Sequence, residues 1–268
     1  MSVLILYLLL ANIFATVCSV NSVAMINGNP VPSASYNTPE LWRNEVFKSF
    51  RQDYSAAAKA GATLIITPEF ALSSNVWRSA CRSPINAATP WCPSLPQNIT
   101  CGDNTPYSTL ACLSKEYQIT GAVNLCEGDA NGTNWNTQAV FGPDGILITK
   151  YRKTHPYLTK CFQAPLQPEL IHFNITTLPF PIGIFTCKDI LYSTPANNLY
   201  KMGIRHFIYS SAIPLVGNVV KELWSDRHKQ AYLMASDASR GQSGVFTSGK
   251  KIVSSSIRNG SVVLWEVE

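Results

Sequence analysis

The stretch "GIFTCKDILY", residues 183–192, places a cysteine where an apolar run gives way to a polar turn. Residues 182–186 are mostly apolar and rich in β-favouring side chains, which predicts a buried strand. Residues 188–202 have a composition typical of a helix. A thiol at such a junction can be an inert core residue, half of a disulfide, or a nucleophile. The remainder of the chain has to decide which of these roles Cys187 has.

Buried strands and helical segments alternate along most of the chain, and a β-rich segment ends it. Strands are expected at residues 62–68, 118–125, 136–142, 146–153, 181–186 and 204–212, helices at residues 39–60, 107–117, 188–202 and 218–236, and a β-meander over residues 243–268. Residues 73–106 read as a long loop that disulfides hold in place. This alternation predicts an α/β fold.

The composition indicates one globular domain. The chain has 268 residues, of which 46% are hydrophobic and 14% are charged, so it can form a sizeable core. Its formal net charge is +5, but lysine and arginine are scattered along the chain. No basic stripe marks a nucleic-acid surface, and we expect no nucleic-acid partner.

The first 20 residues, "MSVLILYLLLANIFATVCSV", have no charged side chain. The small residues Val17 and Ser19 fit a cleavage site, which predicts a signal peptide over residues 1–19 and a mature chain from residue 20. An uncleaved anchor is the alternative, but the apolar run is short for a membrane span and Asn12 interrupts it. The last residues, "SVVLWEVE", form no hydrophobic tail. We therefore expect a secreted protein without a stable membrane anchor.

The cysteines and glycosylation sequons fit an extracellular protein. Of eight cysteines, Cys18 lies at the end of the leader, and seven remain: Cys81, Cys92, Cys101, Cys112, Cys126, Cys161 and Cys187. An odd number in an oxidising compartment leaves one thiol unpaired. The strand-end position makes Cys187 the candidate for it, although a bridged Cys187 with another cysteine free stays possible. Sequons predict glycosylation at Asn98, Asn131, Asn174 and Asn259.

Three chemically suited residues follow predicted strands. Glu69 follows "LIITP", Lys153 ends "ILITKYRK", and Cys187 follows "PIGIFT". Sites form outside the carboxyl ends of strands in α/β sheets, so these side chains are candidates for one pocket. A carboxylate can take the thiol proton, the thiolate can attack an amide, and a lysine can stabilise the oxyanion. Taken singly, each residue is more often a solvated loop glutamate, a surface lysine or an inert thiol.

The segments "ATLIITPEFAL", "ITKYRKTHPY" and "GIFTCKDILY" resemble the glutamate, lysine and cysteine signatures of the nitrilase superfamily of carbon–nitrogen hydrolases. The similarity is greatest to the secreted biotinidase and vanin (pantetheinase) branch and runs over about residues 40–249. The resemblance implies a single-domain α-β-β-α sandwich that needs no cofactor or metal. It implies Glu69 as general base and acid, Lys153 as oxyanion stabiliser and Cys187 as nucleophile. It also implies a linear amide substrate, with pantetheine first and a biotin amide second.

Two departures from the family pattern matter most. Many superfamily members have a second glutamate shortly after the lysine, but "HPYLTKCFQAP" has no acidic residue, and Glu169 is too far along to take that role. Vanins also have a C-terminal domain, whereas we expect residues 20–268 to form the hydrolase domain alone. We therefore predict a secreted amidohydrolase that uses Glu69, Lys153 and Cys187. The alternative is a catalytically weak or inactive secreted binding protein on the same scaffold, which these departures support and the intact trio of residues opposes.

Overall fold

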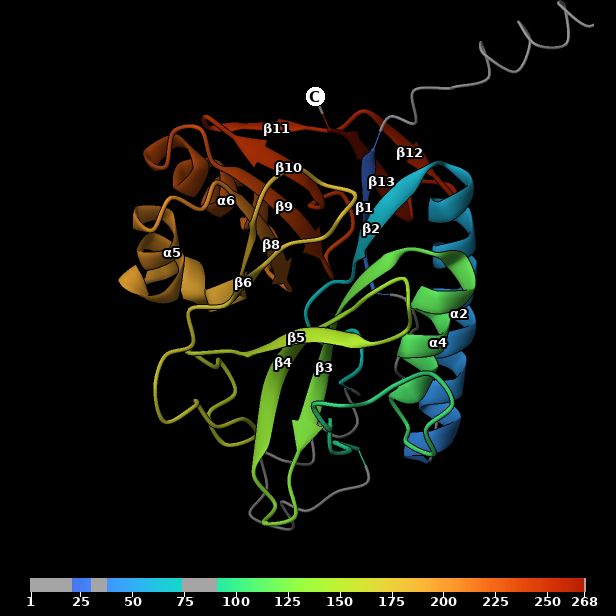
Figure 1. The fold of residues 1–268 in the computed structure, drawn as a ribbon. Helices are drawn as coiled ribbons and strands as arrows, with labels where there is room; N and C mark the ends of the chain where they lie inside the picture. Colours follow the sequence, from blue (N-terminus) through green and yellow to red (C-terminus); the bar gives the residue numbers. More distant parts are fainter. Residues whose placement is uncertain (1–20, 30–37, 74–90, 268) are drawn as a thin grey trace, which may run out of the picture.

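The computed structural model describes residues 21–29, 38–73 and 91–267, so the predicted leader and Cys81 lie outside the described residues. Two β-sheets pack face to face, and helices cover the outer face of each, which gives four layers in the order α-β-β-α (Figure 1). The expected single-domain α/β sandwich is confirmed. None of the helices in the described part is long and apolar enough to cross a membrane.

The first sheet has seven strands in the order β12-β13-β1-β2-β3-β4-β5. Its strands are β1 (Ser22–Ile26), β2 (Ala62–Ile66), β3 (Thr120–Gly128), β4 (Asn134–Phe141), β5 (Leu147–Arg152), β12 (Ser255–Ile257) and β13 (Val262–Glu266). β1, β2 and β3 run parallel, and β4 is antiparallel to both β3 and β5. The carboxyl ends of β2 and β5 therefore lie at the same edge of the sheet.

The second sheet has six strands in the order β11-β10-β9-β8-β7-β6. Its strands are β6 (His172–Phe173), β7 (Ile182–Thr186), β8 (His206–Ser211), β9 (Tyr232–Asp237), β10 (Gly244–Thr247) and β11 (Lys250–Ile252). β7, β8 and β9 are parallel. A parallel bridge between Asn27 and Asp237 joins the carboxyl ends of β1 and β9. The parallel strands of both sheets thus end on the same side of the sandwich.

Helices α2 (Pro39–Lys59) and α4 (Ser108–Tyr117) cover the first sheet (Figure 1). The Thr38 hydroxyl caps α2 by accepting the Leu41 N–H at 3.3 Å, and Pro39 occupies the first turn, where its missing N–H costs no hydrogen bond. The buried face of α2, including Val46 and Phe50, contributes to the core between helices and sheet. This burial explains why the amphipathic pattern correctly predicted the helix.

The core between the two sheets is apolar, and a separate core lies under the helices of the second sheet. Leu64, Val140, Ile184 and Ile208 fill the space between the sheets. The second sheet is covered by α5 (Asn198–Lys201) and α6 (Gly217–Arg227), whose Leu199 and Trp224 pack on Phe185 and Phe207. Strands buried on both faces read as continuous apolar runs, which is the pattern that predicted β2 and β7.

Two predicted helices are wrong in part. Residues 188–202 do not form one helix but a 3₁₀ turn, η1 (Cys187–Leu191), a π-helical turn, η2 (Ser193–Asn197), and α5. Thr194 is extended, with φ −112° and ψ 132°, because the following Pro195 disfavours the helical region for its predecessor. The helix predicted at residues 218–236 ends at Arg227, and its second half is strand β9.

The predicted terminal meander is also divided between the sheets. Its first strands, β10 and β11, extend the second sheet, whereas β12 and β13 join the first sheet beside β1. The short strands β1 and β6 had no counterpart among the predicted elements. The N-terminal strand β1 pairs with β13 on one side and β2 on the other, so it is central to its sheet.

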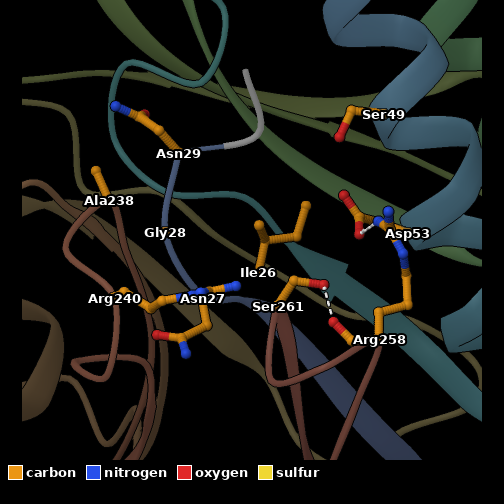
Figure 2. Close-up of a pocket in the computed structure, with 10 residues that line it drawn as sticks. All are labelled: Ile26, Asn27, Gly28, Asn29, Ser49, Asp53, Ala238, Arg240, Arg258 and Ser261. Atoms are coloured by element: carbon orange, nitrogen blue, oxygen red, sulfur yellow. Dashed lines mark hydrogen bonds and ion pairs between the residues drawn. The ribbon is translucent and has the colours of Figure 1, made fainter. Parts of the chain in front are cut away.

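A cavity of about 360 Å³ lies where α2 faces the β12–β13 turn. Figure 2 shows Asp53 of α2 and Arg258 of the turn forming an ion pair at one side of this cavity. Arg258 also donates to the Gln52 amide oxygen at 2.7 Å. Burial raises the pKa of Asp53 to about 6, although the Arg258 charge acts in the opposite direction. The Asp53 carboxyl therefore binds its proton more tightly in the folded state than in the unfolded chain.

The raised pKa of Asp53 gives a stability change of known sign. Its ordinary pKa of 3.8 applies to the unfolded chain, so the folded chain binds more protons between about pH 4 and pH 6. The wild-type free energy of unfolding, relative to that of Asp53→Asn, should be about 1.4 kcal/mol higher at pH 5 than at pH 7.5. Urea unfolding of both proteins at the two pH values measures this, and an equal difference at both would contradict it.

Candidate active site

The structure brings Glu69, Lys153 and Cys187 together at the shared edge of the sandwich. Glu69 lies three residues beyond β2, Lys153 directly follows β5, and Cys187 directly follows β7. Two of these strands belong to the first sheet and one to the second, so the site lies where the two sheets face each other. The parallel direction of the strands explains why three segments distant in sequence meet at one point.

Glu69 and Lys153 form a buried ion pair. The Lys153 Nζ lies 2.5 Å from the Glu69 Oε1, and the two side chains are 0% and 1% exposed. Burial alone lowers the pKa of Lys153, but its carboxylate neighbours, Glu69 first and then Asp189, outweigh the effect of burial and raise the pKa above its ordinary value. Lys153 therefore stays a cation.

Cys187 has a backbone conformation that is rare outside glycine. Its φ is +45°, in the left-handed region, which costs a non-glycine residue about 1 kcal/mol or more. The Tyr209 hydroxyl donates to the Cys187 carbonyl at 2.9 Å and helps to hold this geometry. Cys187 is partly exposed and is the free cysteine among the described residues. The disulfide alternative for Cys187 is thereby contradicted.

The surroundings of Cys187 keep its thiol protonated. Burial raises the pKa of the thiol, the Glu69 carboxylate raises it further, and the Lys153 charge and a hydrogen bond from the Ala212 backbone offset only part of the effect. A thiolate ion pair is therefore not the resting state of this site. The Glu69 carboxyl is hydrogen-bonded to the thiol, so it is placed to accept the thiol proton.

The protonated thiol predicts how Cys187 reacts with a small neutral thiol reagent such as methyl methanethiosulfonate. Only the thiolate reacts, so the rate should rise about tenfold for each pH unit from pH 7 to pH 9.5 and should not level off. Stopped-flow measurement with Cys187→Ala as the blank tests this. A rate that is already constant above pH 7 would mean that the thiolate exists at rest.

A buried aspartate that the sequence did not single out fixes the Cys187 turn. Asp189 accepts the Thr186 N–H at 3.0 Å, the Tyr151 hydroxyl at 2.6 Å and the His155 N–H at 2.9 Å. Its Oδ1 also lies 3.0 Å from the His155 Nδ1. Asp189 therefore ties the turn after β7 to the segment that carries Lys153. It is also the second carboxylate whose charge raises the pKa of Lys153.

Two asparagines of the first sheet also contact the site. The Asn136 side-chain amide donates to the Glu69 Oε1 at 2.9 Å, and its backbone oxygen accepts the Lys153 N–H at 2.8 Å. The Asn124 amide donates to the Asn136 Oδ1 at 2.8 Å. Neither asparagine stands in a motif that marked it in the sequence. The pairing of β3 with β4 brings the two asparagines together, and Asn136 alone of the two hydrogen-bonds to the Glu69 side chain.

The other residues singled out in the sequence lie away from this centre. Glu169 accepts the Arg152 N–H at 2.8 Å and does not hydrogen-bond to Lys153. All four sequon asparagines, Asn98, Asn131, Asn174 and Asn259, are exposed. In the part of the chain that the structure describes, no three His, Cys, Asp or Glu side chains gather as metal ligands.

The disulfides agree in part with the predicted framework. Cys92 pairs with Cys126, and Cys101 pairs with Cys112. Cys161 is disulfide-bonded as well. The first two bridges attach the loop before α4 to β3 and to α4 itself, as the prediction that disulfides hold this loop requires. The odd number of cysteines predicted Cys187 as the unpaired thiol, and Cys187 is the free cysteine among the described residues.

Solved structures with this fold are members of the nitrilase superfamily. An amidase from Nesterenkonia sp. superposes with a TM-score of 0.70 at 13% identity, over 92% of this chain and 90% of the amidase. A nitrilase-superfamily protein of Saccharomyces cerevisiae superposes with a TM-score of 0.67 at 18% identity, over 91% and 89% of the two chains. At these identities the likeness establishes the fold.

Sequence comparison narrows the relationship. A human pantetheine hydrolase is 33% identical over 204 residues, which are 68% of this chain and 37% of that protein. A biotinidase of Takifugu rubripes is 27% identical over 183 residues, which are 61% and 36% of the two. The chain thus matches little more than a third of the length of these relatives. The family model described as carbon-nitrogen hydrolase matches residues 22–238. The chain belongs to the carbon–nitrogen hydrolase family.

Proposed function

We propose that this protein is an amidohydrolase that cleaves a linear carbon–nitrogen bond through a thioester on Cys187. The observation that carries the proposal is the buried Glu69–Lys153 pair beside a free, partly exposed cysteine. Burial of a charged pair is costly in free energy, so a pair placed against a thiol is better explained by chemistry than by stability.

The reaction starts when the Glu69 carboxylate takes the thiol proton and the Cys187 sulfur attacks the amide carbon. The oxyanion that forms lies against the Lys153 ammonium, which is held as a cation by its neighbours. The intermediate collapses, the carbon–nitrogen bond breaks, and Glu69 returns the proton to the leaving amine. Glu69 then takes a proton from water, the water oxygen attacks the thioester, and the carboxylic acid leaves as the thiol is restored.

Pantetheine is the first candidate substrate, and a biotin amide such as biocytin is the second. The support is the similarity to a human pantetheine hydrolase and to a Takifugu rubripes biotinidase. A reactive cysteine also occurs in a protein of similar fold, since a mutant of the Nesterenkonia amidase adds acrylamide to its active-site cysteine by Michael addition.

The cellular setting that we propose is extracellular. A signal peptide over residues 1–19 would direct the hydrolase domain of residues 20–268 to the secretory pathway. The exposed asparagines of the four sequons can accept glycans there, and the disulfides of the described residues suit an oxidising compartment. Expression in a secreting cell line, with N-terminal sequencing and glycosidase treatment of the medium, tests the leader and the four asparagines.

The enzymatic proposal is tested with purified protein on pantetheine and biocytin. Release of cysteamine or lysine should occur, and acid quenching during turnover should trap an acyl group on the peptide that contains Cys187, because thioesters survive at low pH. Hydrolysis without an acyl group on this peptide would overturn the mechanism. Binding of either amide without turnover would overturn the enzymatic proposal and support a binding protein on the same scaffold.

A further inference from the structure

We propose that Asn136, held in place by Asn124, is a positioning residue that fixes the Glu69 carboxylate and determines which of its two oxygens takes the Cys187 proton. The inference rests on the proposed function for its catalytic meaning. The contacts from which it is drawn are independent of any substrate.

The hydrogen-bond polarity of this network follows from one backbone group. The Phe70 N–H can only donate, and it lies 2.7 Å from the Asn124 side chain, so the atom that accepts it is Oδ1. The Asn124 Nδ2 is therefore the donor to the Asn136 Oδ1 at 2.8 Å. The Asn136 Nδ2 must then face the Glu69 Oε1, at 2.9 Å. The Phe70 N–H thus determines which side-chain atom of Asn124, and in turn of Asn136, is the oxygen and which is the nitrogen.

Asn124 also holds the backbone on both sides of Glu69. Its N–H donates to the Thr67 hydroxyl at 2.9 Å, two residues before Glu69, and its Oδ1 accepts the N–H of Phe70, directly after Glu69. Phe70 has a φ of +64°, so this turn is unfavourable for its side chain without such support. Asn124 and Asn136 are both fully or almost fully buried.

The two oxygens of Glu69 are consequently not equivalent. Oε1 accepts two hydrogen bonds, one from Lys153 at 2.5 Å and one from Asn136 at 2.9 Å. The Cys187 thiol is hydrogen-bonded to the same carboxyl, and we infer that Oε2, which accepts neither of these two bonds, is the oxygen that takes its proton.

The titratable groups that face Glu69 are Lys153 after β5, Cys187 after β7 and Tyr209 on β8. None of them changes when Asn136 is replaced. The same titratable neighbours therefore surround Glu69 in every protein compared. A difference in the titration of Glu69 between an Asn136 variant and the wild type then results from the changed contact with residue 136.

Three variants test the proposal. Asn136→Leu removes the donor, Asn136→Asp keeps the shape but places a second carboxyl against Glu69, and Gln138→Leu is the matched control. Gln138 lies two residues along β4, is fully buried, and its amide has no hydrogen-bond partner among the described residues. It resembles Asn136 in burial and chemistry but makes no hydrogen bond to Glu69.

The expected result is a fall in kcat of about 100-fold in Asn136→Leu, with KM little changed, and unchanged kcat in Gln138→Leu. The acid limb of the pH–rate profile should move upward in Asn136→Leu and further upward in Asn136→Asp, because a like charge opposes ionisation more than a lost donor does. Wild-type kcat per folded molecule and an unmoved acid limb in both Asn136 variants would overturn the proposal.

A second readout does not depend on turnover. The titration of the Glu69 carboxyl can be followed by ¹³C NMR in protein labelled at glutamate, with Glu69→Gln to assign the signal. Its midpoint should rise in the order Gln138→Leu, Asn136→Leu, Asn136→Asp, and equal midpoints in all three would overturn the positioning role. If wild-type protein hydrolyses no amide, the proposed function fails, while this titration still decides the role of Asn136.

Discussion

Replacing Cys187 by alanine should abolish amide hydrolysis and leave the fold intact. The substitution removes the only atom that can form the thioester, so kcat should fall on the order of 10⁴-fold or more, to the level that binding and the oxyanion contact alone can support. Cys187 is free, so no cross-link is lost with it. Steady-state rates on pantetheine, together with circular dichroism and thermal unfolding, measure both parts of the prediction.

Cys187→Ser is the companion variant. A hydroxyl occupies nearly the same space but is a far weaker nucleophile at neutral pH, so it should be almost as inactive as the alanine variant. Retention of wild-type kcat in Cys187→Ala would show that the reaction does not pass through this sulfur. A large loss of thermal stability in both variants would instead assign Cys187 a structural role.

Lys153→Met should reduce both activity and stability, and a double variant separates the two effects. The single change leaves the Glu69 carboxylate buried without its counter-ion, which should lower the free energy of unfolding by about 3–5 kcal/mol. Loss of the oxyanion contact should lower kcat by about 10²- to 10³-fold, because that contact forms mainly in the transition state. Activity assays and urea unfolding measure the two losses.

The double variant Glu69→Gln with Lys153→Met removes both charges of the buried pair. It should recover much of the lost stability, since no unpaired charge remains buried, but it should recover no activity. If Lys153→Met changes KM far more than kcat, Lys153 binds substrate and does not stabilise the oxyanion. If the double variant regains activity, neither charge takes part in the reaction.

Much of this architecture can be predicted from the sequence, because parallel strands that are buried on both faces consist of continuous apolar runs. The runs at β2 and β7 gave their strands directly, and the residues at their ends, Glu69 and Cys187, could be proposed as neighbours before any coordinates. The apolar run at β9 was assigned to the preceding helix. A short, fully buried strand has no alternation of apolar and polar residues, so its sequence does not differ in periodicity from a buried helical segment.

The supporting residues could not be found in the same way. Asn124 and Asn136 meet because β3 and β4 pair in one particular register, and a shift of one residue would turn one of the two side chains to the opposite face. Asp189 is close to Cys187 in sequence, but two of its partners come from the part of the chain that forms the first sheet. Tyr151 is on the edge strand β5, and His155 is in the segment that follows β5. Contacts between segments that are distant in the sequence produce no hydrophobic periodicity from which they could be predicted.

The place of β13 between β1 and β12 has a consequence for biosynthesis. The first strand of the domain, Ser22–Ile26, obtains one of its two hydrogen-bonding neighbours only when Val262–Glu266 has left the ribosome. Until then β1 presents an open row of amide and carbonyl groups along one side. Chains that stall or are cut before Val262 should therefore associate through this edge, and the nascent protein should depend on chaperones until Val262–Glu266 is made.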